Sequence, residues 1–196
     1  MGAMTDGPNG QGGVRISDPR VMRALAHPAR IEIVEYLNNT GAVVTATECA
    51  GMVGLSPSAT SYHLRELAKY GLVEQAPSRG DGRERVWRSP GTGLRIEGDA
   101  EQPEAREAER ALVDVFLTRD YDRIRKWAAG RAGEAGPWRD ASTLVSTQLL
   151  LTVEEMTAVN QKVEELLEPY RVRGRRADPP EGSRTVAVTY TAFPFD

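Results

Sequence analysis

Small hydroxyl side chains and one arginine follow each other closely over the first two turns of a predicted helix. The residues concerned are Ser58, Ala59, Ser61, Tyr62 and Arg65. Hydroxyl groups bind phosphate oxygens or base edges without bulk, and a guanidinium one turn further on can reach a phosphate or a guanine edge. The pattern therefore predicts contacts with double-stranded DNA. An ordinary solvated helix face, which would carry the same residue types, is the alternative.

A second group of basic residues surrounds a predicted turn at residues 78–82. It consists of Arg79, Arg83 and Arg85. The segments on either side, 72–76 and 84–88, have the character of short strands. Two strands joined by an Asp-Gly turn form a hairpin, and arginines on such a hairpin can bind phosphates or enter the minor groove. The alternative is a solvated run of charges, because acidic residues in the same segment partly offset the arginines.

Helices that precede the hairpin would hold the first group of residues in position. A helical pattern begins at Pro19 and is interrupted at Pro28, which favours a short helix followed by a second one. A Thr-Ala-Thr-Glu capping box at residues 45–48 opens a third helix, and Gly54 ends it. A Ser-Pro pair at residues 56–57 opens the next helix after a tight turn. This order predicts a winged helix-turn-helix, which places its second motif helix in the major groove.

Three stretches of this region resemble the ArsR-like winged-helix repressors of bacteria. They are Leu25–Arg30 (LAHPAR), Leu55–Leu67 (LSPSATSYHLREL) and Gly71–Val73 (GLV). The resemblance covers about residues 18–90 and corresponds to the entry segment, the recognition helix and the step into the wing. It implies a dimeric bacterial repressor whose affinity for DNA a ligand can change.

The ligands of a metal-sensing relative are scarce in this chain. A thiolate or imidazole site needs several convergent ligands, whereas the chain has one cysteine, Cys49, and two histidines, His27 and His63. We expect Cys49 in the core, His27 at a helix start and His63 in packing. We therefore expect no metal site and no cofactor. The sequence also lacks a glycine-rich phosphate loop and a nucleophile elbow, so we expect no enzyme.

A long helix is predicted from Pro103 to about Ala129, and its apolar residues cover a wide face. We expect a homodimer to form through Leu112, Phe116, Leu117, Tyr121 and Ile124. A dimeric DNA-binding protein needs such an interface. Packing of this face within one chain is the alternative.

The last third of the chain changes to a strand, helix, strand pattern. The predicted strands are 142–151 and 184–193, and the predicted helix is 153–168. The expected fold class is mainly α with small β, with an N-terminal winged helix-turn-helix, a long dimerisation helix and a C-terminal small α/β unit. The expected domain limits are 1–16 for a disordered tail, 17–95 for the winged helix DNA-binding domain, and 96–196 for a dimerisation and regulatory region.

Charge is distributed unevenly along the chain. The net charge of −3 argues against a nucleic-acid-binding protein, but residues 18–90 carry nine basic and eight acidic side chains, against fifteen and nineteen in residues 91–196. No run of 18 apolar residues and no signal peptide occurs, and a single cysteine gives no sign of an oxidising compartment, so we expect a cytoplasmic protein.

Together these patterns predict a sequence-specific DNA-binding transcriptional regulator, a repressor that acts as a homodimer on an inverted repeat. Its expected partners are double-stranded DNA, a second copy of the chain and an unidentified small-molecule effector, with no membrane. The alternatives are a winged-helix protein–protein interaction module, and a small-molecule-binding protein that uses its C-terminal α/β region.

Overall fold

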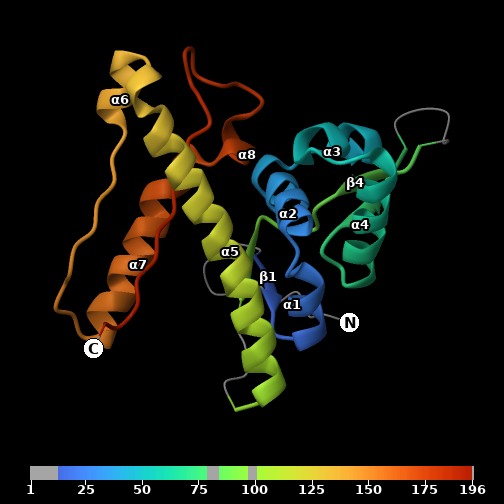
Figure 1. The fold of residues 1–196 in the computed structure, drawn as a ribbon, viewed down its shortest axis with the longest axis horizontal. Helices are drawn as coiled ribbons and strands as arrows, with labels where there is room; N and C mark the ends of the chain where they lie inside the picture. The colour runs from blue at the N-terminus through green and yellow to red at the C-terminus, as the bar shows by residue number, and fades with distance from the viewer. Residues whose placement is uncertain (1–12, 79–83, 97–100, 196) are drawn as a thin grey trace. The chain divides into compact units, whose positions relative to one another are not determined.

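The computed structural model describes residues 13–78, 84–96 and 101–195 (Figure 1). These residues fall into two compact units, divided between Thr118 and Arg119 inside the longest helix. The helices of the first unit are α1 (Pro19–Leu25), α2 (Pro28–Thr40), α3 (Ala46–Val53), α4 (Pro57–Lys69) and the first part of α5 (Pro103–Gly130). Its strands are β1 (Gly13–Ile16), β2 (Val44–Thr45), β3 (Glu74–Ala76), β4 (Val86–Arg88) and β5 (Gly93–Ile96).

Local sequence signals set the starts of these helices, as predicted. Pro28 begins α2 after the break at Ala26, and His27 caps it by accepting a hydrogen bond at Nδ1 from the backbone N–H of Ala29, at 3.2 Å. The capping box is present at α3: Thr45 Oγ1 accepts from the N–H of Glu48 at 3.1 Å, and the Glu48 carboxylate accepts from the N–H of Thr45 at 2.6 Å. Such caps satisfy backbone donors that a helix leaves unpaired. The helix-turn-helix order is therefore confirmed.

The two strands of the predicted hairpin are present and paired, whereas residues 79–82 of its turn lie outside the described residues. A third strand that the sequence did not indicate joins the pair. β3 pairs antiparallel with β4, with Gln75 opposite Trp87, and β2 pairs with the other edge of β4. β2 is only two residues long, which is too short for a period of two to be recognised in a sequence. The resulting sheet has the order β2-β4-β3, so the wing is attached directly to the start of α3.

A second small sheet corrects two expectations. Residues 13–16, predicted as part of a disordered tail, form β1, and residues 93–96, predicted as a linker, form β5; the two strands are parallel. Val14-Arg15-Ile16 and Leu94-Arg95-Ile96 share an alternation of apolar and basic residues, and the register pairs them position by position. That shared alternation was the available signal, but each copy is too short to stand out from a polar surrounding.

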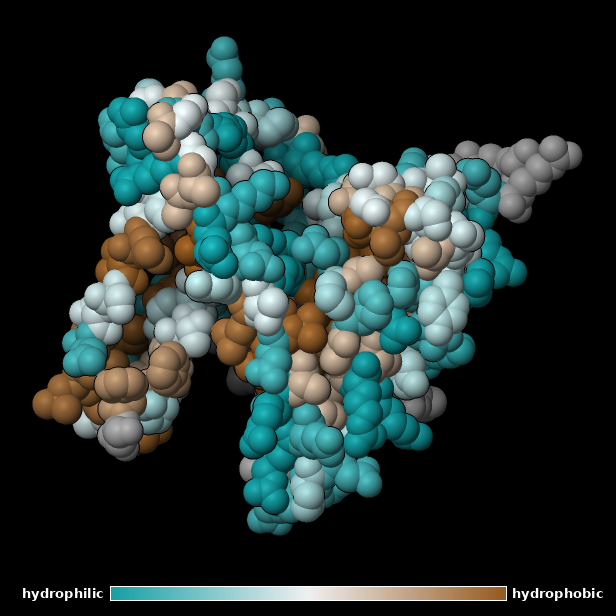
Figure 2. Space-filling view, viewed as in Figure 1, coloured by the Kyte–Doolittle hydropathy of each residue, from teal (hydrophilic) through white to brown (hydrophobic). Residues whose placement is uncertain are grey.

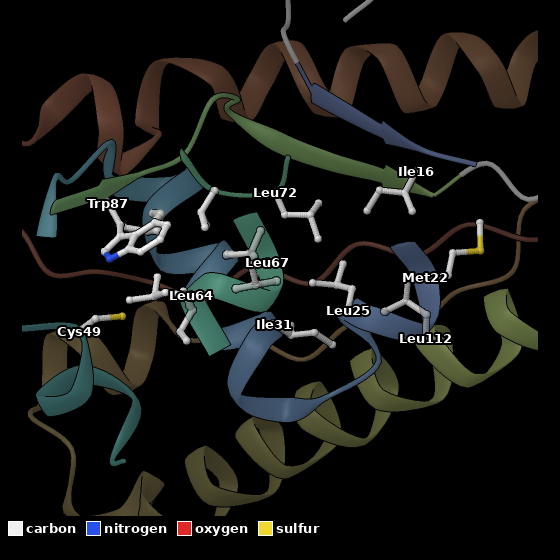
Figure 3. Packing of buried hydrophobic residues seen from close by; sticks show 14 of the residues in the cluster. Ile16, Met22, Leu25, Ile31, Cys49, Leu64, Leu67, Leu72, Trp87 and Leu112 are labelled. Atoms are coloured by element: carbon white, nitrogen blue, oxygen red, sulfur yellow. The ribbon is translucent and has the colours of Figure 1, made fainter. Parts of the chain in front are cut away.

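The core of the first unit is built from nearly every one of its elements (Figure 3). Leu25, Ile31, Leu64 and Leu67 meet between the helices, and Ile16 and Trp87 close the core from the two sheets. Burial of such side chains stabilises a fold by roughly 1.5–3 kcal/mol each. α5 contributes Ala105, Ala108 and Leu112 to the same core.

The second unit is helical and partly irregular, which corrects the predicted strands. Its elements after α5 are a 3-10 turn (Arg131–Gly133), α6 (Gly136–Ala141), α7 (Val153–Leu167), a 3-10 turn (Glu168–Tyr170) and α8 (Val172–Arg175). The predicted helix is confirmed as α7, with its Thr152–Glu155 capping box. Segments 142–151 and 184–193 are not strands here. A strand requires a neighbour for its backbone, and neither segment has one within the described part of the chain.

The class is thus confirmed as mainly α with a small amount of β and a winged helix-turn-helix. None of the helices in the described ranges has the length and apolar character required to cross a membrane.

Candidate nucleic-acid interface

The turn between α3 and α4 positions the predicted recognition helix. Gly54 ends α3 with a left-handed backbone at φ +67°, a conformation that residues with a Cβ adopt at a cost. Ser56 then caps α4, because its Oγ accepts a hydrogen bond from the N–H of Ala59 at 3.3 Å, and Pro57 occupies the first turn. These two signals fix the direction in which α4 leaves the turn.

α4 has one buried face and one exposed face. Thr60, His63, Leu64 and Leu67 are buried. Among the predicted DNA-contacting residues, Ser58, Tyr62 and Arg65 are exposed, while Ala59 and Ser61 are half-buried. The side chain of Tyr62 keeps 50% of its surface accessible, which is high for an aromatic residue beside a packed core. The structure therefore brings the predicted group together on the accessible side of α4.

Side-chain hydrogen bonds organise the exposed face. The Arg65 guanidinium donates to Ser61 Oγ at 2.7 Å, one helical turn away, and the Ser58 hydroxyl lies 3.2 Å from Ser56 Oγ. Glu66, the acidic residue of this helix, is paired with Lys69, and this hydrogen bond holds the pKa of Glu66 below its ordinary value. The positive charge of Lys69 therefore balances the negative charge of Glu66, and the charge of Arg65 on the same helix is left uncompensated by Glu66.

A polar cluster under α4 attaches the helix to the elements before it. The Arg30 Nε donates to His63 Nδ1 at 3.4 Å, and another Arg30 nitrogen donates to the carbonyl of Ala24 at 2.6 Å. The rings of His63 and His27 lie 4.6 Å apart. Burial, followed by the nearby His27 and Arg30, lowers the pKa of His63, which keeps its ring neutral and able to accept the bond from Arg30. The sequence predicted packing for His63, but it did not indicate Arg30 as its partner.

The wing is anchored on its inner side and exposed on its outer side. Val86 and Trp87 are buried, and Ser89 Oγ donates to Asn38 Oδ1 on α2 while accepting from the N–H of Gly91 at 3.1 Å. This buried polar link has no local sequence signature, because Asn38 and Ser89 are 51 positions apart.

The arginines of the wing have different environments. Arg88 is held by the Glu74 carboxylate at 2.7 Å across the strand pair. Arg85 is exposed just before β4. Arg79 and Arg83 lie outside the described residues. Of the three predicted wing arginines, the structure describes Arg85, which lies on the accessible surface.

The predicted dimerisation residues do not form one surface. Leu112 is fully buried in the core of the first unit, so this assignment is corrected: a side chain used within the chain cannot contact a second copy. Phe116 and Ile124 are half-buried. Leu117 and Tyr121 remain 56% and 60% exposed. The apolar face of α5 thus consists of two parts. The residues up to Leu112 pack into the core of the first unit, whereas Leu117 and Tyr121 remain exposed.

Cys49 is a core residue in α3, as predicted. Its side chain has no accessible surface, and burial raises the pKa of its thiol to about 11. A buried neutral thiol is a poor metal ligand, since the thiolate is the species that binds. In the described ranges no group of three His, Cys, Asp or Glu side chains is arranged to hold a metal ion.

Comparisons with known proteins find one family that the helix-turn-helix resembles. Residues 27–75 match the family described as bacterial regulatory protein, arsR family. No curated protein matches the chain significantly. The family is one of regulatory proteins, and a helix-turn-helix is a DNA-binding element.

Several solved structures are similar over part of their length. A possible transcriptional regulator for arsenical resistance is 29% identical, with a TM-score of 0.32, and the match covers 55% of this chain and 94% of that one. A mutant of ZitR from Lactococcus lactis is 14% identical, with coverage of 74% and 84% and a TM-score of 0.34. YusO from Bacillus subtilis is 15% identical, with coverage of 76% and 83% and a TM-score of 0.32. TM-scores this low say nothing about the function of this chain.

The caps, the turn, the buried His63 and the exposed hydroxyl face all lie within the matched segment or directly beside it. At residues 27–75 the helix-turn-helix of this chain is similar to that of the arsR family of bacterial regulatory proteins.

Proposed function

We propose that this chain is a transcriptional repressor that binds an inverted repeat in double-stranded DNA as a homodimer. The observation that carries the proposal is the exposed face of α4. It presents Ser58, Tyr62 and Arg65 to solvent, while the opposite face is fixed by core packing and by the bond from Arg30 to His63.

The geometry of α4 suits the major groove. A helix of 13 residues is about 20 Å long, and the major groove of B-DNA admits one α-helix. The first two turns hold the hydroxyl groups, whose donors and acceptors can be satisfied by phosphates or by base edges. Arg65 is already oriented by Ser61, so less side-chain freedom is lost when it binds.

The wing supplies a second, less specific contact. We propose that Arg85, with Arg79 and Arg83, binds the DNA backbone or the minor groove. The anchoring of β4 by Trp87 and by the Ser89–Asn38 bond fixes the base of the wing relative to α2.

Dimer formation is assigned to the exposed part of α5. Leu117 and Tyr121 stand four positions apart, which is the spacing of neighbours on one helix face. A twofold axis through such an interface would present two copies of α4, and half-sites of helix-turn-helix dimers are about 34–36 Å apart.

An effector and a location complete the proposal. A small molecule that binds one spacing of the two recognition helices more tightly than another would change DNA affinity, and we propose residues 141–196 as the region that responds. We place the activity in the cytoplasm, where bacterial DNA is found.

The test is selection of binding sites from random duplex DNA by the full chain, followed by gel retardation at several salt concentrations. We expect an enriched inverted repeat with half-sites about one helical turn apart, and binding that weakens as salt rises. Enrichment of no sequence, with capture of a protein partner instead, would contradict the proposal and favour an interaction module.

A further inference from the structure

The second unit exposes more apolar surface than a self-sufficient fold would. From Arg119 to Phe195 the structure buries no side chain fully. Figure 2 shows apolar residues on its surface, and large exposed patches of this kind mark interaction sites. The main helix of this unit, α7, has a complete capping box, so the missing burial there concerns tertiary packing rather than helix formation.

Two extended segments carry most of this surface. They run beside α7 in Figure 1, and they cover residues 143–151 and 184–195. In the first segment the exposed large apolar residues are Leu144, Val145, Leu149, Leu150 and Leu151. Leu150 is 101% exposed and the other four are 40–73% exposed, so much of the apolar surface of this segment is not covered by the described part of the chain.

The second segment has the alternation of a half-buried strand. Val186, Val188 and Tyr190 recur at a period of two and are exposed, and Thr and Ala occupy the intervening positions. Phe193 and Phe195 continue the exposed apolar surface. A strand of this composition requires a cover on one face and hydrogen-bonding neighbours at its edges.

Side chains already hold the second segment in place without using its backbone. Tyr190 Oη donates to Asn160 Oδ1 on α7 at 2.9 Å, and Thr189 Oγ1 donates to Asp120 at 3.3 Å. At its start, Arg184 donates to both oxygens of Glu134, at 2.9 and 3.3 Å, and this bond lowers the pKa of Glu134. The segment is therefore positioned, while no strand of the described chain pairs with it.

Charge indicates which partner fits. The chain is 27% charged, yet residues 141–153 and 185–195 contain no charged side chain at all. Exposed edge strands of natural proteins are usually protected by charges, so neutral strands are expected to be paired. Two identical neutral strands can also lie opposite each other without the cost of like charges.

We propose that a second copy of the chain covers these segments, and that residues 143–151 and 184–195 become strands of a sheet shared between two copies. This proposal rests on the homodimer of the proposed function and adds a second interface to α5. Identical strands pair antiparallel across a twofold axis, which is the symmetry of a dimer. Two strands from each copy also exceed the two-stranded sheet that is marginal in water.

The available area is sufficient for such an interface. Five large apolar side chains in each segment, at their observed exposures, offer on the order of 1,000 Å² per chain. A stable dimer of standard size buries about 800 Å² per partner.

The test compares Val188→Lys with Ala177→Lys, a matched change in the exposed loop after α8, in the full chain. Hydrogen exchange of peptides from 143–151 and 184–195 and sedimentation are measured over a range of concentrations. We expect slow exchange in the parent and in Ala177→Lys that becomes faster on dilution. In Val188→Lys we expect exchange to be faster by about tenfold or more, with weaker association.

Single cysteines at Thr185, Ala187 and Thr191 provide a second readout that does not depend on the lysine variant folding. At least one should form a disulfide with its own copy on oxidation, while a cysteine at Ala177 should not. Suppose that the parent sediments as a dimer, but both segments exchange fast and none of the single-cysteine variants forms a cross-link. This result would overturn the shared sheet and leave the homodimer of the proposed function intact. A parent that is monomeric throughout would also overturn the homodimer. Protection that does not depend on concentration would show pairing within one chain and overturn the inference as well.

Discussion

The two units of this chain differ in how far they bury their apolar side chains. The first unit buries side chains from all its helices and from three of its strands, including Leu64, Leu67 and Leu112, without a second molecule. The second unit has a well-capped α7 and two neutral extended segments, yet it buries no described residue fully. Clear local signals such as helix caps therefore do not ensure a closed core, because a core also requires enough helices and strands to enclose it. The first unit has a closed core of its own, whereas the second leaves many of its large apolar side chains exposed.

The largest expected effect that separates the units is on stability. Leu112→Ala should lower the free energy of unfolding of the first unit by about 2–5 kcal/mol, because it leaves a cavity in a closed core. Leu150→Ala should cost less than about 0.5 kcal/mol at concentrations where the chain is monomeric. Hydrogen exchange under native conditions measures the first change in peptides from α2 and α4, and the second in peptides from α7. Equal effects of the two changes would break the comparison.

The next effect concerns Cys49 in the closed core. Cys49→Ser should destabilise the first unit by about 1–3 kcal/mol, because a buried hydroxyl needs a hydrogen-bond partner, whereas a thiol hydrogen-bonds only weakly. The native thiol, with a pKa of about 11, should react with a thiol reagent at pH 8 far more slowly than in urea. Cys49→Ala is the control, since it removes volume without adding a polar group. Rapid labelling of the folded chain would contradict a closed core.

A smaller effect is expected at the wing. Arg85→Ala should weaken binding to all DNA sequences and reduce the slope of log affinity against log salt by about 1, because one phosphate contact is lost. Arg110→Ala, an equally exposed arginine on α5, should leave the slope unchanged. A loss confined to one base pair would instead assign Arg85 to a specific contact.

The smallest effect is a pH dependence of the first unit. The pKa of His63 is lowered in the folded chain, so the unfolded chain binds the proton more tightly. The stability that depends on neutral His63 is therefore present at neutral pH and is lost as pH falls below the ordinary value of 6.5. His63→Gln should make stability less dependent on pH between about 7.5 and 5, while His27 and Arg30 remain unchanged. Identical pH profiles for parent and variant would contradict this assignment.

The sequence predicted those parts of the fold that local signals determine. The capping boxes at Thr45 and Thr152 and the Ser56-Pro57 start act within a few residues, and they correctly predicted the starts of α3, α4 and α7. It also predicted the exposed group on α4, because burial alternates along a helix with a known period.

The remaining features depend on contacts between distant residues. The β1–β5 pair, the Arg30–His63 bond and the Ser89–Asn38 bond each join segments that only the folded chain brings together. Leu112 was assigned to the wrong surface for the same reason: an apolar face shows that something covers it, but not whether the cover is its own chain. The segments predicted as strands, 142–151 and 184–193, have the expected composition, but they pair with no strand among the described residues.

The central claim is that the exposed face of α4 contacts base edges. The most direct measurement is the affinity of the Ser61→Ala, Tyr62→Ala double variant for the selected DNA site and for a scrambled site of equal length, with Arg110→Ala as the control. We predict that the double variant loses about 1–3 kcal/mol for each base contact on the selected site, and much less on the scrambled one. Affinity for the selected site equal to that of the parent and of Arg110→Ala would contradict the account.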